Sequence, residues 1–213
     1  MVAFTKSTGG STGEKTDGYK FKDGEQKVRL FGDILPRYLF WVPNARGNPS
    51  ELPVEALQYD RESESWDNSR KEPVKEQYPD LKSKWSYSCL CATPDGEIKV
   101  FNFKRTLFNQ LQDAAETLGD PTDLDEGYWV VFKKKKTGPS PLNVEYALDA
   151  LKCQKEQGAV SDELREKIKE HKTIEEIYPR PTEEEVRKNL ENIMSSGNDE
   201  EVDEEATGEF EVE

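Results

Sequence analysis

Aromatic and cationic side chains lie next to each other in several segments of this sequence that have the composition of β-strands. The segments are Arg29–Phe31, Arg37–Trp41, Lys84–Tyr87, Lys99–Arg105 and Tyr128–Lys133. Flat rings can stack on unpaired bases, at about 1–3 kcal/mol per base, while neighbouring cations contact phosphates. Because any single aromatic residue in a strand more often belongs to the core, the prediction depends on the whole set.

We predict a binding surface for single-stranded nucleic acid on these strands, with little sequence preference. Its candidate residues are Arg29, Arg37, Trp41, Trp85, Tyr87, Phe101, Phe103, Lys104, Arg105, Trp129, Lys133 and Lys135. The basic run Lys133–Lys136 has an alternative interpretation as the solvated end of a strand.

Enzymatic chemistry finds little support in the residue types. The chain has a single histidine, His171, in a polar context that favours a surface position over a general base. No glycine-rich phosphate loop, nucleophile elbow or His-Glu-x-x-His motif occurs. Cys89 and Cys91 are one position apart and distant from Cys153, which favours buried strand cysteines over a zinc site. We therefore expect no catalysis, no metal and no cofactor.

The formal net charge of -14 is unevenly distributed. Residues 195–213 contain nine acidic residues and no Lys or Arg, so the other 194 residues carry only -5. Residues 20–47 hold six basic residues against three acidic ones. Local basic patches are therefore compatible with phosphate binding despite the acidic average.

Cysteine usage and the terminal segments suggest a compartment. Three cysteines, an odd number, do not suggest a disulfide framework, and a reducing cytoplasm fits best. The first residues lack the apolar core of a signal peptide, and no stretch is long and apolar enough to cross a bilayer. We expect a protein of the cytoplasm, which would be the host cytoplasm for a viral protein.

The apolar pattern predicts a mainly β fold with peripheral helices. Strands are expected within residues 27–42, at 84–103 as a hairpin around Pro94-Asp95-Gly96, and at 127–136 and 142–148. An amphipathic helix is expected at 107–118, closed by Gly119, and further helices from residue 161 onward. Several strands with one helix late in the series are typical of a small barrel such as the OB fold.

Composition divides the chain into segments. We expect a flexible arm at residues 1–24 and a core at 25–155 with a long insertion at 43–83. A helical connector at 156–194 and a disordered acidic tail at 195–213 would follow.

In the order of its segments the chain resembles the single-stranded-DNA-binding, helix-destabilising proteins of tailed bacteriophages. The resemblance covers about residues 19–150 and the acidic tail, and depends on three segments. These are YKFKDGEQKVRLFGDI, KWSYSCLCATPDGEIKVFNFKRTLFNQL and EGYWVVFKKKKTGPSPLNVEYAL. It implies an OB-type barrel that protects single-stranded DNA during replication, recombination and repair. Carried over by position, it implies groove residues at Arg29, Trp85, Tyr87, Phe101, Lys104, Arg105, Trp129, Lys133 and Lys135.

The chain departs from the family's best-studied branch in two ways. That branch holds a zinc ion through one histidine and three cysteines, and no matching cluster occurs here, which places this chain in a branch without the zinc site. A basic N-terminal arm mediates cooperative self-association in that branch, and only Lys6-Ser7-Thr8 is similar to its motif.

The acidic tail is expected to compete with DNA for the basic groove and, once displaced, to bind replication and recombination proteins. Its expected partner-binding residues are Asp203, Glu204, Glu205 and the apolar Phe210. Two other functions stay open on the sequence alone: an acidic protein-interaction module whose aromatics only fill a core, and an RNA-binding OB protein.

Overall fold

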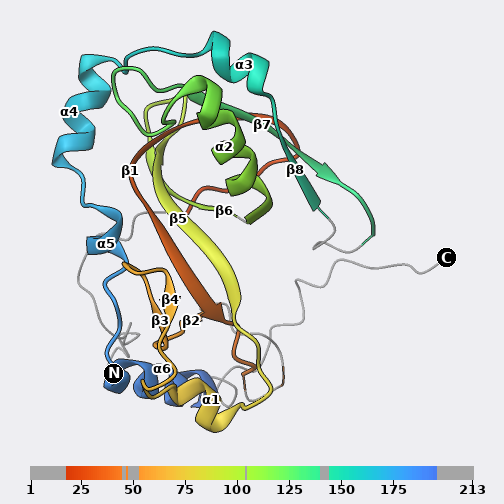
Figure 1. The fold of residues 1–213 in the computed structure, drawn as a ribbon, viewed down its shortest axis with the longest axis vertical. Coiled ribbons are helices and arrows are strands. Elements are labelled where there is room, and N and C mark those ends of the chain that lie inside the picture. Colours follow the sequence, from red (N-terminus) through yellow and green to blue (C-terminus); the bar gives the residue numbers. More distant parts are fainter. Residues whose placement is uncertain (1–17, 45–46, 48–52, 104, 140–143, 196–213) are drawn as a thin grey trace, which may run out of the picture. The chain divides into compact units, whose positions relative to one another are not determined.

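The computed structural model describes residues 18–44, 47, 53–103, 105–139 and 144–195 (Figure 1). The chain forms two compact units. The first comprises the residues up to Pro36 and Trp85–Arg180, and the second comprises Arg37–Lys84 and the residues from Pro181. The expected arm lies mostly, and the expected tail almost wholly, outside the described residues.

A sheet with the strand order β6-β5-β1-β7-β8 forms the centre of the first unit. Its strands are β1 (Gly24–Phe40), β5 (Lys84–Ala92), β6 (Ile98–Phe103), β7 (Trp129–Lys136) and β8 (Val144–Leu148). The pairs β5–β6, β1–β7 and β7–β8 are antiparallel. The predicted hairpin is confirmed: Gly96 in its turn has φ +77°, a conformation that favours glycine.

The described residues of the first unit form the helices α2 (Arg105–Leu118), α3 (Ala150–Lys155), α4 (Asp162–Glu170) and α5 (Ile174–Ile177). Asp149, Ser161 and Thr173 begin α3, α4 and α5, and each side chain accepts a hydrogen bond from a backbone N–H of the first turn. Gly119, with φ +80°, follows the last residue of α2, as the sequence predicted.

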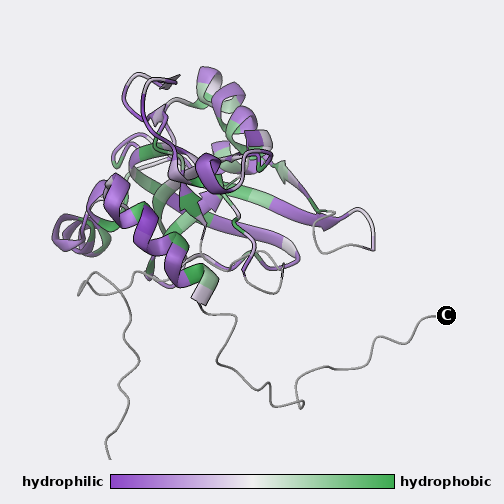
Figure 2. Ribbon diagram, turned by 90° about the horizontal axis from the view of Figure 1, so that it is seen from below, coloured by the Kyte–Doolittle hydropathy of each residue, from purple (hydrophilic) through white to green (hydrophobic). Residues whose placement is uncertain are grey.

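Both faces of the central strands are buried. Successive side chains of a strand point to opposite faces, and in β5 the two sets belong to two different core clusters. Cys89 and Cys91 of β5 belong to a core cluster that α2 covers with Leu107, Leu111 and Leu118. Leu90 and Ala92 belong to a second cluster, which includes Leu164 of α4 and Ile174 of α5. In Figure 2 the helices carry both colours of the hydropathy scale, as amphipathic helices do. The expected mainly β fold with peripheral helices is confirmed, and the sheet is compatible with an OB-type core.

The second unit contains short elements and one longer helix. These are β2 (Val54–Glu55), β3 (Tyr59–Asp60), β4 (Ser65–Trp66), α1 (Pro73–Gln77) and α6 (Glu183–Ser195). β2 pairs with the last residues of β1, β3 pairs with β4, and α6 packs against α1 and β2. Thr182 caps the start of α6: its hydroxyl accepts from the Glu185 N–H, and the Glu185 carboxylate accepts from the Thr182 N–H.

Polar groups are buried in pairs in the second unit. The Glu72 carboxylate accepts hydrogen bonds from the N–H groups of Leu57 (2.7 Å) and Gln58 (3.3 Å). Arg61 makes two charged hydrogen bonds to Glu55, of 2.7 and 2.5 Å, with both side chains largely buried. The described part of the predicted insertion at residues 43–83 is therefore organised by hydrogen bonds of its own.

None of the described helices combines the length and the hydropathy of a membrane-spanning segment.

Arg29 holds the loop between α2 and β7. Its side chain is fully buried, and its Nη2 donates a hydrogen bond of 2.5 Å to the carbonyl oxygen of Asp123. Burial lowers the pKa of the guanidinium, and the nearby Asp123 carboxylate opposes that effect. Gly127 closes the same loop, and a Cβ at this position would lie 2.3 Å from the Asp123 carbonyl oxygen and 2.8 Å from that of Asp120.

We expect Gly127→Ala to lower the free energy of unfolding by about 1–3 kcal/mol, because backbone atoms of the loop must shift to admit the methyl group. Urea denaturation followed by circular dichroism measures this change. Gly18→Ala is the matched control, since a Cβ there meets no atom within 4 Å. Equal stability of the two variants would contradict the close packing of this loop.

Candidate functional site

Three of the predicted aromatic residues lie in the core of the first unit. Tyr87, Phe101 and Phe103 are buried, at 6%, 0% and 3% exposure. The Tyr87 ring stacks on Phe108 at 3.8 Å between centroids and on Phe103 at 5.7 Å, and Phe103 is 5.3 Å from Phe101. The faces of these rings are therefore used for packing within the unit.

The predicted tryptophans are more accessible. Trp85 is half-buried, with its ring 5.0 Å from that of Tyr87 at the edge of the aromatic core. Trp129 is half-buried on β7, and the Lys27 Nζ lies 5.2 Å from the centre of its ring. Trp41 is 40% exposed and belongs to the second unit.

Some of the predicted cations are buried and others are exposed. Arg29 and Arg37 are buried, whereas Arg105, Lys133 and Lys135 are exposed. Lys104 lies outside the described residues. The exposed candidates come from the start of α2 and from β7, so that the structure brings only part of the predicted set to the surface.

Trp129, Lys133 and Lys135 share one face of β7, because they are separated by even numbers of residues. On the neighbouring strand β1, Lys27 is opposite Val131 and Glu25 is opposite Lys133. This sheet face therefore places the Trp129 ring and cations from two strands side by side, and the β1 cation, Lys27, is not one of the predicted candidates.

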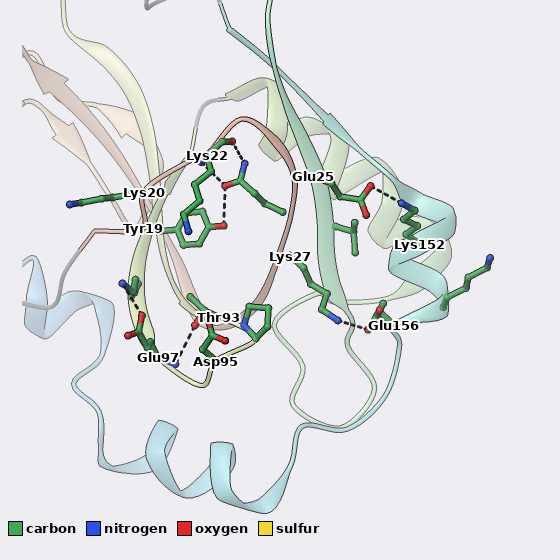
Figure 3. Close-up of a pocket in the computed structure, with 15 residues that line it drawn as sticks. Tyr19, Lys20, Lys22, Glu25, Lys27, Thr93, Asp95, Glu97, Lys152 and Glu156 are labelled. Atoms are coloured by element: carbon green, nitrogen blue, oxygen red, sulfur yellow. Dashed lines mark hydrogen bonds and ion pairs between the residues drawn. The ribbon is translucent and has the colours of Figure 1, made fainter. Parts of the chain in front are cut away.

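Next to this face the first unit has a pocket of about 810 Å³ (Figure 3). Six lysines occur among its described lining residues: Lys20, Lys22, Lys27, Lys99, Lys152 and Lys155. Its carboxylates are those of Glu25, Asp95, Glu97 and Glu156, which leaves a net charge of +2. The surplus of positive charge is local, in a chain whose net charge is -14.

The pocket has walls from separate parts of the first unit. In Figure 3, Tyr19, Lys20 and Lys22 come from one side, and Glu25, Lys27, Lys152 and Glu156 come from the opposite side. The turn between β5 and β6 contributes Thr93, Pro94, Asp95 and Glu97. The pocket is thus a meeting point of the segment before β1, the hairpin turn and α3.

The side chain of Gln26 fastens the segment that carries Lys20 and Lys22. Its amide oxygen accepts hydrogen bonds from the Tyr19 hydroxyl (3.0 Å) and the Lys22 N–H (2.9 Å), and its amide nitrogen donates to the Lys22 carbonyl oxygen. Burial raises the pKa of the Tyr19 hydroxyl to about 12, with a smaller contribution from Cys91, so this hydroxyl keeps its proton as a donor. The Tyr19 N–H also donates to the Val100 carbonyl oxygen at 2.8 Å, which anchors the segment to the sheet.

Three of the pocket lysines form ion pairs within it. Lys27 Nζ lies 3.1 Å from Glu156 Oε2, and Lys152 Nζ lies 2.6 Å from Glu25 Oε2. Lys99 pairs with Glu97 at 3.0 Å. The hydrogen bond from Lys152 is the largest influence that lowers the pKa of Glu25, and the same contact raises the pKa of Lys152.

Lys20, Lys22 and Lys155 differ from the other three. In the part of the chain that the structure describes, their ammonium groups have no carboxylate partner within ion-pair distance, and all three are exposed. An anion that binds at any one of these ammonium groups therefore breaks no ion pair.

Sequence reasoning missed the pocket lysines. The alternation in Tyr19-Lys20-Phe21-Lys22 could have indicated them, because Tyr19 and Phe21 pack on the core while Lys20 and Lys22 are exposed. Lys152 and Lys155 carry no such signal, since their helix reaches the pocket only through the tertiary fold.

The cysteines lie in the core. Cys89, Cys91 and Cys153 are free and fully buried. Burial raises the pKa of the Cys89 thiol to about 12, and that of Cys91 in the same direction. Among the described residues no group of three or more His, Cys, Asp or Glu side chains is arranged to hold a metal ion.

The predicted tail residues Asp203, Glu204, Glu205 and Phe210 lie outside the described residues, as does Lys6-Ser7-Thr8.

Over most of its length the chain is similar to a bacteriophage protein whose name describes single-stranded-DNA binding. That relative is the "Probable ssDNA-binding protein" of Escherichia phage T5. The two are 27% identical over an alignment of 229 positions, which covers 89% of this chain and 85% of the phage protein. No protein-family model matches the chain.

We expect Gln26→Leu to speed hydrogen exchange of the Lys22 amide roughly tenfold, because the side-chain acceptor of this N–H is lost. Hydrogen–deuterium exchange followed by NMR measures the rate. Gln112→Leu on the exposed face of α2 is the control and should leave the Lys22 amide unchanged. An unchanged rate in Gln26→Leu would contradict the fastening role of Gln26.

Proposed function

We propose that this protein binds single-stranded DNA without catalysis. The observation that carries the proposal is the group of cations and the Trp129 ring on one side of the first unit, in a chain similar along most of its length to a phage protein named for this activity. Cations beside an accessible ring are the combination that holds an unpaired strand.

The accessible residues are the proposed contacts. Trp129 and Trp85 offer rings for stacking, and Arg105 and Lys135 offer charges to the phosphates. Lys133 is a further proposed contact, and its Nζ must first leave Glu25 Oε2, which lies 3.6 Å away. Trp41 is a further candidate ring. The buried candidates Arg29, Tyr87, Phe101 and Phe103 serve the proposed site indirectly, since they pack inside the unit that carries the contacts, whereas the buried Arg37 belongs to the second unit.

The proposed role is protection of single-stranded DNA during replication, recombination and repair, in the cytoplasm of an infected host. Residues 195–213 are proposed to recruit the proteins of these processes through Asp203, Glu204, Glu205 and Phe210. Residues 195–213 contain nine acidic side chains and no Lys or Arg, whereas the pocket of the first unit has a surplus of positive charge. This separation supports DNA binding by the first unit and protein recruitment by residues 195–213. Cooperative self-association on DNA, through the segment around Lys6, is part of the same proposal.

We expect oligo-dT to quench the tryptophan fluorescence of the protein, because stacking on a base reduces emission. The double variant Trp85→Phe, Trp129→Phe should lose most of the quenching, whereas Trp66→Phe should keep it. Trp66 is a suitable control because it is 43% exposed and packs on Tyr38 and Tyr59 in the second unit.

Salt dependence decides whether the contact is to phosphates. The logarithm of the affinity should fall with the logarithm of the salt concentration, by about 0.7 per neutralised phosphate. A flat titration with oligo-dT would overturn the proposed function. A matched RNA oligomer that binds more tightly than the DNA would assign the site to RNA.

Deleting residues 195–213 should tighten binding to oligo-dT at low salt by about three- to tenfold, because a polyanion that competes for the cations is removed. The gain should vanish near 1 M salt, where the screening length is about 3 Å. Unchanged or weaker binding at low salt would contradict the competition.

A further inference from the structure

We propose that the lysine pocket beside β1 holds phosphates of the bound strand, and that Glu156 and Glu25 act inside it as competitor anions that keep Lys27 and Lys152 from the phosphates. The inference rests on the proposed function and adds to it a binding site and a limit on affinity that is built into the folded unit. The ligand is the sugar–phosphate backbone of a single strand, which presents successive anions at a spacing that no single small ion has.

The unpaired lysines come from separate walls of the pocket. Lys20 and Lys22 come from the segment that Gln26 fastens, and Lys155 comes from the end of α3. They are contributed by parts of the chain that are far apart in sequence, and they line one pocket together. A backbone with several phosphates can contact more than one of these walls at once.

The two glutamates lie against lysines of the pocket. Glu156 lies 3.1 Å from Lys27, and Glu25 lies 2.6 Å from Lys152, so each carboxylate takes the place beside an ammonium group that a phosphate oxygen would need. The four side chains are between 35% and 46% exposed, and solvent reaches each pair. Exposed pairs of this kind contribute about 1 kcal/mol or less to stability, so removing a carboxylate leaves the fold intact and frees its lysine for a phosphate.

Lys27 lies close to a proposed stacking residue. Its Nζ lies 5.2 Å from the centre of the Trp129 ring, and Trp129 is a proposed stacking residue. A phosphate at Lys27 therefore belongs to a nucleotide beside a base on Trp129. The pair Lys27–Glu156 is thus the point where the pocket and the sheet face with Trp129 meet.

This arrangement predicts how steeply the affinity for DNA falls with salt concentration. A lysine that stays paired with a glutamate neutralises no phosphate and contributes nothing to the salt slope, whereas an unpaired lysine in contact contributes about 0.7. The wild-type slope should therefore be smaller than the number of pocket lysines suggests. Removing one carboxylate should add one phosphate contact.

The decisive experiment measures the affinity of the full chain for oligo-dT over a series of salt concentrations. Glu156→Gln should bind about three- to tenfold more tightly at low salt and should steepen the slope by about 0.7. Lys27→Met alone should change both quantities little, and the double variant Lys27→Met, Glu156→Gln should lose the gain. Lys22→Met, which removes an unpaired lysine, should weaken binding and flatten the slope by about 0.7.

Glu166→Gln is the matched control. It makes the same change in net charge and breaks the same kind of pair, Lys169–Glu166 at 2.6 Å on α4, and neither residue lines the pocket. Circular dichroism verifies that all variants are folded.

The outcomes separate the inference from the proposed function. Equal gains in Glu156→Gln and Glu166→Gln, or a gain that survives in the double variant, would overturn the inference while binding itself stands. Unchanged slope in Lys22→Met would do the same. A wild-type protein that fails to bind oligo-dT would overturn the proposed function, and the inference with it.

Discussion

Burial of the central strands on both faces is the constraint on which the other features depend. α2 covers one face of β5, and α4 and α5 cover the other, so that strands rich in aromatic residues have no free face there. Side chains that contact a ligand at the surface must then come from the strand ends, from β7 and from the segments around the sheet. Trp129 and the lysines of residues 20–27 lie in these places.

The same constraint explains how much the sequence could predict. The hairpin around Pro94-Asp95-Gly96 and the helix closed by Gly119 follow from local signals, and both occur as expected. Which aromatic side chains are accessible could not be read from alternation, because Leu90 and Cys91 are both buried although they point to opposite faces. The site depends further on tertiary pairs such as Glu25 with Lys152, which are separated by more than a hundred residues and leave no periodic signal.

Charge in this protein is organised at two scales. The whole chain carries -14, yet the pocket beside β1 has a small positive surplus, and half of its lysines are paired with carboxylates. Net charge therefore says little about what a particular surface attracts. The relevant quantity is the number of cations without a partner at that surface, and short-range contacts set this number.

The three thiols carry a practical consequence. Cys89, Cys91 and Cys153 are inaccessible in the folded first unit, and burial keeps their thiols protonated at neutral pH. Alkylating reagents then modify only molecules in which the sheet has opened. The rate of labelling therefore measures how fast this core opens, and no probe has to be engineered into the chain.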